Sequence, residues 1–214
     1  MIETEKDQET EEMEERKSWL VGKLLTNRLF NKEAMLSTLK VVWKISRNVK
    51  VTVLESNLFI FKFASLKDKQ RVIDGSPWSF NKNLVVFKDY NGDLRGLDYK
   101  FETAQFWVRV YGFPLRMLTK QCATIISSKL GELIQTNIGN SDFLRLQVNM
   151  DVTKPLRKFI TVTGGVGKGE IWGRLGYERL LTFCYECGVI GHNEYKCEQA
   201  PVERYESNTK QYGD

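Results

Sequence analysis

Alternating apolar and polar positions mark strands in the first part of the chain. Residues 19–26 (WLVGKLLT) form one apolar run, and residues 49–53 and 58–63 carry Val or Phe at every second position. Between the first two strands, apolar residues recur at helical spacing behind Asn31, a good N-cap, and predict a helix from Lys32 to about Trp43. The apolar face of this helix comprises Met35, Leu36, Leu39, Val42 and Trp43.

Two further elements complete this unit. Ser65 followed by Asp68 is a capping-box signature, which predicts a short helix through Ile73 that the Gly-Ser-Pro run at 75–77 ends. LVVFKDY at 84–90 is the last strand. The order β-α-β-β-α-β predicts an α+β, ferredoxin-like fold, which is also the order of the RNA-recognition motif. Two helices then cover one face of the sheet and leave the other face open.

Compared with the RNA-recognition motif, this unit lacks the aromatic residues that stack on bases. Leu20 falls at one stacking position, with Trp19 and Val21 pointing into the core. Leu58 and Ile60 fall at the other two. We therefore expect the alternating phenylalanines of the third strand to be core residues, and the aliphatic stacking positions to be buried against another element.

A second α+β unit follows. Its order is β-α-β-β-β: a strand at 106–112, a helix from about Thr119 to Leu133, a strand at 143–152, and a hairpin of 157–162 and 170–175. The hairpin loop GGVGKG at 164–169 resembles a phosphate-binding loop, but Gly169 stands where such a loop needs Ser or Thr. A plain hairpin loop is the better interpretation.

Charge is distributed unevenly along the chain. The formal net charge of +5 combines −5 over residues 1–17, +13 over 18–180 and −3 over 181–214. A basic body favours a polyanionic partner, although surface lysines that keep a domain soluble give the same pattern. The acidic segment 1–17 has few apolar residues and is predicted to be a disordered tail, as are residues 199–214.

Cysteine and histidine cluster in CYECGVIGHNEYKC, residues 184–197. The spacing is C-x2-C-x4-H-x4-C, and it gathers three of the four cysteines and the sole histidine of the chain. Three thiolates and one imidazole complete a tetrahedral zinc site, so we predict one Zn²⁺ held by Cys184, Cys187, His192 and Cys197. A redox-active Cys-x-x-Cys pair would leave the last two of these ligands unexplained.

This motif resembles the CCHC zinc knuckle of retroviral nucleocapsid and retrotransposon proteins. The ligands and both glycines, Gly188 and Gly191, match, and Tyr185 occupies the aromatic position that stacks on an unpaired base. Retroviral knuckles are usually basic, whereas Glu186 and Glu194 make this one acidic. The basic body would therefore have to supply the attraction to phosphate.

The flanking sequence extends the resemblance over roughly residues 18–198. FWVRVYGFPL at 106–115, D-V-x-K-P-L-R at 151–157 and Y-E-R-L at 177–180 resemble a plant family of retrotransposon-derived proteins. Members of that family, encoded by LINE-type non-LTR elements, carry an uncharacterised N-terminal domain ahead of the knuckle. The resemblance implies zinc and nucleic-acid binding.

Five segments follow from these patterns: an acidic tail (1–17), a domain like the RNA-recognition motif (18–97), a second α+β unit (98–180), the zinc knuckle (181–198) and a C-terminal tail (199–214). The expected function is non-catalytic binding of single-stranded RNA or DNA. Tyr185 is expected to stack on a base. The residues expected to contact phosphate are Lys154, Arg157, Lys158, Arg174 and Arg179. Trp107 and Arg109 share a strand face that suits bases and phosphate, or packing on the first domain.

The alternative function is a protein-interaction adaptor, in which the knuckle and the acidic tails bind a partner or a second copy of the chain. Catalysis is not expected, because the only histidine is a metal ligand and four protein ligands leave no open position on the zinc. No uncharged apolar stretch approaches the ~18 residues of a membrane span, and the acidic N-terminus is unlike a signal peptide. We therefore expect no membrane partner, and an intracellular location in the nucleus, the cytoplasm or both.

Overall fold

The computed structural model describes residues 12–26, 28–45, 48–55, 57–139, 142–164, 169–180 and 182–198. The chain divides into two compact units, Met1–Phe101 and Glu102–Asp214, which places the boundary four residues after the one predicted. Within the segment predicted to be a disordered tail, residues 12–16 are helical, with Arg16 paired to Glu12. Residues 1–11 and 199–214 lie outside the described residues, and the disorder predicted there stays a prediction.

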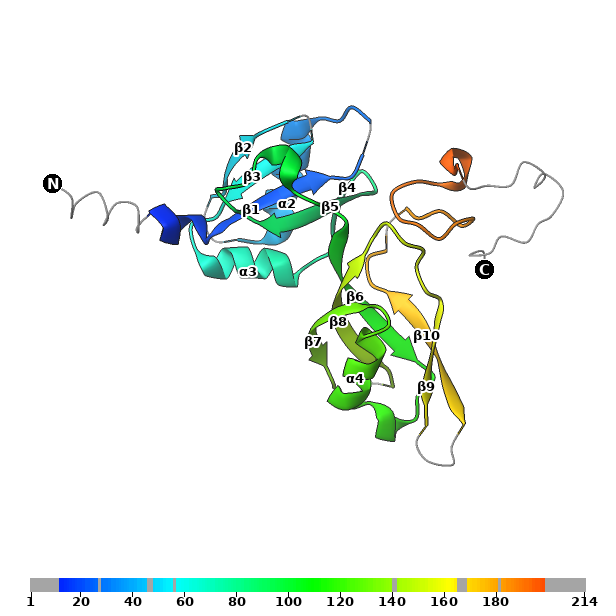
Figure 1. The fold of residues 1–214 in the computed structure, drawn as a ribbon. Coiled ribbons are helices and arrows are strands. Elements are labelled where there is room, and N and C mark those ends of the chain that lie inside the picture. Colours follow the sequence, from blue (N-terminus) through cyan, green and yellow to red (C-terminus); the bar gives the residue numbers. More distant parts are fainter. Residues whose placement is uncertain are drawn as a thin grey trace. The chain divides into compact units, whose positions relative to one another are not determined.

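In the first unit, an antiparallel five-stranded sheet is combined with the two predicted helices (Figure 1). The strand order is β2-β3-β1-β5-β4. The elements are β1 (Trp19–Leu24), α2 (Lys32–Trp43), β2 (Lys50–Val53), β3 (Leu58–Lys62), α3 (Leu66–Asp74), β4 (Trp78–Phe80) and β5 (Asn83–Asp89). The predicted β-α-β-β-α-β order is confirmed. Strand β4 is additional: it has only three residues and pairs with β5 at the sheet edge, and its sequence shows no alternation long enough to predict it.

Local capping fixes where both helices begin. The Asn31 side chain accepts a hydrogen bond from the Ala34 amide at 2.9 Å, and the Ser65 hydroxyl accepts one from the Asp68 amide at 3.2 Å. Helix α2 buries Met35, Leu39 and Trp43 against the phenylalanines of β3, as predicted. Val42 is exposed, so the apolar face of the helix is narrower than the pattern suggested.

Both faces of the first sheet are covered. Leu20 pairs with Phe61 and lies in the helix-side core, whereas Trp19 and Val21 lie on the other face, so the predicted orientation of β1 is reversed. On that other face Val21, Leu58 and Ile60 are at most 9% exposed.

Residues 90–101 return across this second face (Figure 1). The Tyr90 ring lies 5.0 Å from Trp19, and Gly96, in the short helix η1 (Gly96–Asp98), lies against Leu58. Lys23 Nζ lies 5.6 Å from the centre of the Phe101 ring. The aliphatic stacking positions are therefore covered, as expected for Leu58 and Ile60, and the face offers no open platform for bases.

The second unit repeats this sheet topology (Figure 1). Its elements are β6 (Thr103–Tyr111), α4 (Lys120–Ser127), β7 (Gly131–Asn137), β8 (Leu144–Asp151), β9 (Phe159–Thr163) and β10 (Glu170–Tyr177). The strand order β7-β8-β6-β10-β9 matches that of the first sheet when strands are counted within each unit. Residues 152–158 stand where the first unit has α3, and they form turns and extended chain.

One predicted element of this unit is wrong. Helix α4 ends at Ser127, and the segment expected to continue it forms the edge strand β7. Gly131 explains the change: its φ is +156°, and a Cβ there would lie 2.3 Å from the Asn149 carbonyl oxygen. Only glycine lets the chain approach β8 this closely. The predicted β9–β10 hairpin is confirmed.

Candidate metal centre and nucleic-acid interface

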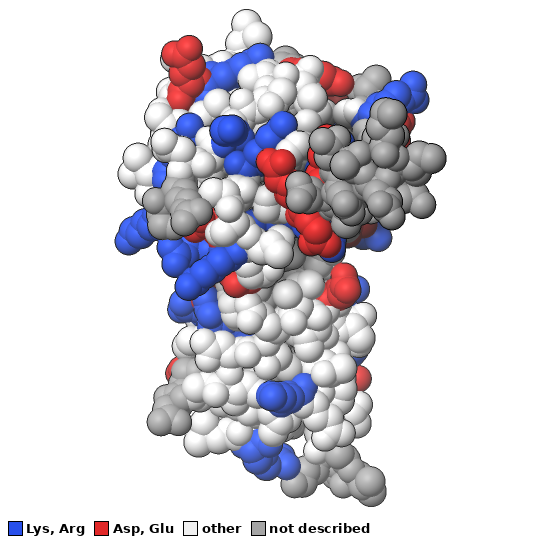
Figure 2. Space-filling view, turned by 90° about the vertical axis from the view of Figure 1, so that its left-hand side faces the viewer, with Lys and Arg blue, Asp and Glu red and all other residues white. Residues whose placement is uncertain are grey.

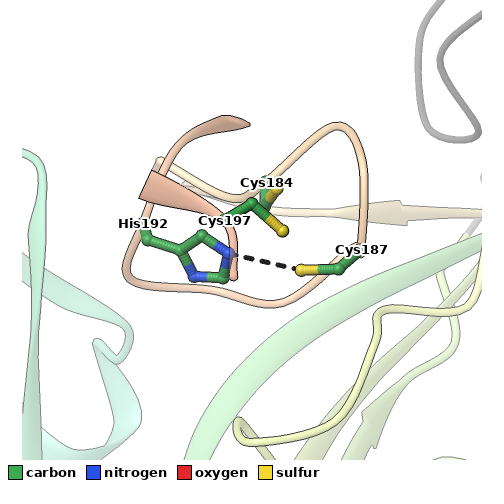
Figure 3. A group of neighbouring side chains, drawn as sticks. All are labelled: Cys184, Cys187, His192 and Cys197. Carbon is green, nitrogen blue, oxygen red and sulfur yellow. Dashed lines mark hydrogen bonds between the residues drawn. The ribbon is translucent and has the colours of Figure 1, made fainter. Parts of the chain in front are cut away.

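The four predicted zinc ligands converge (Figure 3). The ligand atoms of Cys184, Cys187, His192 and Cys197 all lie within 4.8 Å of one another, and Cys187 Sγ is 3.3 Å from His192 Nε2. A zinc tetrahedron with Zn–S bonds of about 2.3 Å and a Zn–N bond of about 2.0 Å places its ligand atoms roughly 3.5–3.8 Å apart. The residues therefore fit a zinc knuckle that binds one metal ion.

Tight backbone turns bring the ligands together. The Gly188 amide donates to the Cys184 carbonyl at 2.8 Å, which closes the turn that carries the first two cysteines. Gly188 and Gly191 have φ values of +77° and +102°, a backbone conformation that favours glycine. The short helix η3 (Glu194–Lys196) then leads into Cys197. The backbone conformation thus explains why glycine occupies both positions of the motif.

Cys184 is the most deeply buried of the four ligands. Cys184 is fully buried, and burial raises the pKa of its thiol to about 12. Zinc binds thiolates, so binding must displace this proton, and zinc affinity should rise with pH. Zn²⁺ with three thiolates carries a net charge of −1, which adds to the acidic character of the loop.

The knuckle is joined to the second unit by a hydrogen bond. The Leu156 amide donates to the Gly188 carbonyl at 2.9 Å, and Leu156 is itself buried. The Tyr177 hydroxyl, near the end of β10, donates to the Arg157 carbonyl at 2.8 Å. The run 151–157, which the sequence analysis identified, therefore contacts the metal loop directly.

The same run borders a basic hollow of about 900 Å³ at the end of the second sheet. Its cationic lining residues are Lys129, Lys154, Arg157 and Lys158. The structure thus brings together three of the predicted phosphate contacts and adds Lys129, which the sequence had placed within a helix. Lys154 Nζ lies 2.8 Å from Asp151, and its hydrogen bond lowers the pKa of that carboxyl to about 2. A phosphate at Lys154 would therefore compete with a carboxylate already bound there.

The remaining predicted contacts lie elsewhere, so the single phosphate-binding set expected near the knuckle is divided. Trp107, Arg109 and Arg174 project from the second sheet on the face opposite the apolar core. Arg179, with a φ of +53°, lines a smaller hollow of about 390 Å³ beside Arg109. Sequence reasoning missed Arg145 on this face, because strand pairing alone brings it opposite Arg109.

Glu178 holds two of these arginines. Its carboxylate accepts hydrogen bonds from Arg109 Nε at 2.6 Å and from Arg145 Nε and Nη2 at 2.8 Å each. The hydrogen bond from Arg145, and then that from Arg109, lowers the pKa of Glu178 from 4.5 to about 2, although burial opposes the shift. Glu178 is therefore ionised at neutral pH and fixes both guanidinium groups.

Two tyrosines of the knuckle are accessible. Tyr185, the predicted stacking residue, is 39% exposed, and its ring lies 4.7 Å from that of Phe183. Tyr195 is 90% exposed and was not predicted as a contact; its position between two charged residues was the available signal. On the face of the molecule in Figure 2, basic side chains form separate groups, with acidic residues among them.

Comparison with known proteins gives two family matches. The model of a domain of unknown function (DUF4283) matches residues 12–95, and a zinc knuckle model matches residues 150–199. The second match begins in β8 and includes the run 151–157, which contacts the metal loop. In this chain a region similar to DUF4283 is thus followed by a region similar to a zinc knuckle.

The "Uncharacterized protein At4g02000" of Arabidopsis thaliana is 23% identical over 141 residues. The match covers 64% of this chain and 44% of that protein, so the chain spans less than half of the relative's length. Among solved structures, the first two RRM domains of yeast poly(U) binding protein (Pub1) match with a TM-score of 0.26 and 7% identity, over 75% of this chain and 98% of that one.

In the described part of the chain, no helix combines the length and the apolar character needed to cross a lipid bilayer.

Proposed function

We propose that the chain binds single-stranded nucleic acid through its zinc knuckle and the basic hollow beside it. The α+β fold with the strand order of the RNA-recognition motif and the CCHC knuckle both suggest nucleic-acid binding. The hydrogen bond between Leu156 and Gly188 carries the proposal further, because it holds the basic run 152–158 next to the metal loop. Exposed rings on the knuckle would stack on bases while the hollow binds phosphates.

The preference for single strands follows from the chemistry of the knuckle. A tyrosine ring stacks only on a base whose face is accessible, which a duplex does not offer. The acidic knuckle repels phosphate, so the electrostatic part of binding falls to the adjacent basic residues. Arg157 and Lys158 are both exposed at the mouth of the hollow and are the residues expected to act there.

The proposal includes three expectations from the sequence: the absence of catalysis, the location of the protein and its origin. With His192 in the metal cluster and four protein ligands on the zinc, we propose a non-catalytic protein. We also propose an intracellular location, and an origin from a LINE-type element that rests on the sequence resemblance.

Fluorescence anisotropy with labelled single- and double-stranded RNA and DNA, at two salt concentrations, tests this function. We expect Tyr185→Ala to retain zinc and to bind single strands less tightly. The double variant Arg157→Ala, Lys158→Ala should bind all sequences less tightly and with a flatter salt dependence. The matched control Lys40→Ala, Lys67→Ala removes two exposed charges from the first unit and should bind like the unmodified chain.

Equal binding by the Tyr185→Ala, Arg157→Ala/Lys158→Ala and control variants would refute the proposal. An unmodified chain that binds no oligonucleotide would refute it as well. Either result would favour the adaptor function, in which the knuckle contacts a protein.

A further inference from the structure

The second sheet presents an unusual combination of side chains on the face opposite its apolar core. Along β6, buried and half-buried residues alternate, and the outward set contains Trp107, Arg109 and Tyr111. Strand pairing adds Arg145 from β8 and Arg174 from β10 to the same face. We call this face the Arg–aromatic face; it also carries Gln105, Phe143, Gln147, Phe159 and Trp172.

Planar cations lie over planar rings throughout the Arg–aromatic face. The Arg145 guanidinium carbon lies 3.6 Å from the centre of the Trp107 ring. Arg174 lies 5.0 Å from the Tyr111 ring, and Arg109 lies 5.0 Å from the Phe143 ring. Guanidinium groups and aromatic rings are both surfaces on which nucleobases stack, and the guanidinium groups also bind phosphate.

Three arginines of this face lie close together, and their cluster carries a local excess of positive charge. Arg109 and Arg145 are directly opposite each other on adjacent strands, an arrangement that repels. Glu178 neutralises one of these two charges, and Arg174 adds a third guanidinium group. Glu132, Asp151 and Glu170 lie at other positions of the same face, paired with Asn149, Thr103 and Thr163, so the excess of positive charge is confined to the cluster of three arginines around Glu178.

Two aromatic side chains on this face are more than half exposed to solvent. Trp172 is 65% exposed and Phe159 is 53% exposed. Phe159 pairs with Arg174, and Trp172 is two residues from Arg174 on β10, so both rings flank that guanidinium group. Large exposed rings beside an exposed cation match the composition of surfaces that bind single strands.

Amide side chains add hydrogen-bonding groups for base edges. Gln135 donates to Gln147 at 2.6 Å, and Gln147 donates to Gln105 at 3.2 Å, which forms a row of amides across three strands. Gln147 is fully buried, whereas Gln135 is exposed and Gln105 is half-buried. Amide ends at the surface suit the donors and acceptors of unpaired bases.

From these observations we infer that the Arg–aromatic face is a second site for single-stranded nucleic acid, separate from the knuckle. The ligand class is an unpaired strand of RNA or DNA, whose bases stack on the rings and whose phosphates pair with the arginines. The inference deepens the proposed function and rests on it. The matching face of the first sheet is covered by residues 90–101 and has aliphatic residues at its centre, so it cannot serve in this way.

Trp172→Ala in the full-length chain tests the site, because an exposed side chain can be removed without opening the core. With oligouridylate and oligodeoxythymidylate as probes, we expect affinity to fall roughly 5- to 150-fold, the range for one lost base–aromatic stack. Trp172→Phe keeps a ring and should restore most of the affinity. Leu115→Ala removes another exposed apolar side chain of the same unit and should have no effect.

The outcomes separate this site from the knuckle. Unchanged affinity in Trp172→Ala would overturn the inference, and a loss of binding in Tyr185→Ala would then leave the proposed function standing. A Trp172→Ala chain that melts at a lower temperature but binds as before would identify a packing or protein-binding surface, which also overturns it. If the unmodified chain binds neither probe, both proposals fall. Photo-crosslinks from thiouridine to residues 170–177, distinct from those to 182–197, would support the second site.

Discussion

Removing the metal should unfold the knuckle and leave the rest of the chain folded. Ordering the fourteen residues from Cys184 to Cys197 costs at least about 14 kcal/mol of backbone entropy, at about 1 kcal/mol or more per residue. Four backbone hydrogen bonds inside the loop, at about 1 kcal/mol each, and the burial of Ile190, at about 2 kcal/mol, offset less than half of this cost. Structural zinc contributes about 10–16 kcal/mol, which is enough to make up the difference.

Amide NMR spectra with and without a chelator would measure this effect. We expect the amide signals of 182–198 to lose their chemical-shift dispersion, while those of the two sheets keep theirs. The Leu156 amide should lose its protection from hydrogen exchange, because its acceptor is the Gly188 carbonyl. Cys187→Ser should reproduce the change. Cys122→Ser is the matched control, since Cys122 lies in α4 and outside the metal cluster, and it should keep one zinc per chain. Persistent order in 182–198 after complete zinc removal would refute the reasoning.

Three further predictions follow from the packing and the charges. Ile60→Ala should lower the free energy of unfolding by roughly 2–5 kcal/mol, measured by urea denaturation, without weakening oligonucleotide binding, because this side chain is buried. Gly22→Ala should cost roughly 1–3 kcal/mol in the same assay, since a Cβ would lie 2.7 Å from ring carbons of Phe61 and Phe87; an equally stable variant would contradict the packing described. Glu178 should titrate near pH 2 by carboxyl NMR, and its contribution to stability should be present above its ordinary pKa of 4.5 and disappear as pH falls toward 2. Glu178→Gln should remove that part of the acid sensitivity.

What the sequence predicts well is determined locally. The zinc ligands lie within fourteen residues, and their identities and spacing specify the metal without reference to the rest of the fold. Asn31 and Ser65 cap helices through hydrogen bonds to residues three positions away, so their signal is also local. Both long helices and four of the five strands of the first unit follow from such local patterns, whereas the short edge strand β4 does not.

The wrong predictions concern residues whose conformation is determined by tertiary contacts. Strand β1 is buried on both faces, so its sequence has no polar alternation that could show which way Leu20 points. The helix predicted beyond Ser127 ends because Gly131 must lie against Asn149, a contact that no local pattern encodes. The division of the basic residues into two surfaces likewise depends on strand pairing, which alone sets Arg145 opposite Arg109.

In the proposed function, the contribution of the basic residues to binding depends on the folded metal loop beside them. The zinc centre is anionic and the knuckle carries two glutamates, so the metal loop by itself attracts phosphate poorly. Its affinity must come from a cationic neighbour held at a fixed place, and the hydrogen bond from Leu156 to Gly188 provides that placement. Loss of zinc should therefore weaken binding more than Tyr185→Ala does, because it removes both the stacking ring and the attachment of the knuckle to the run that carries Arg157 and Lys158.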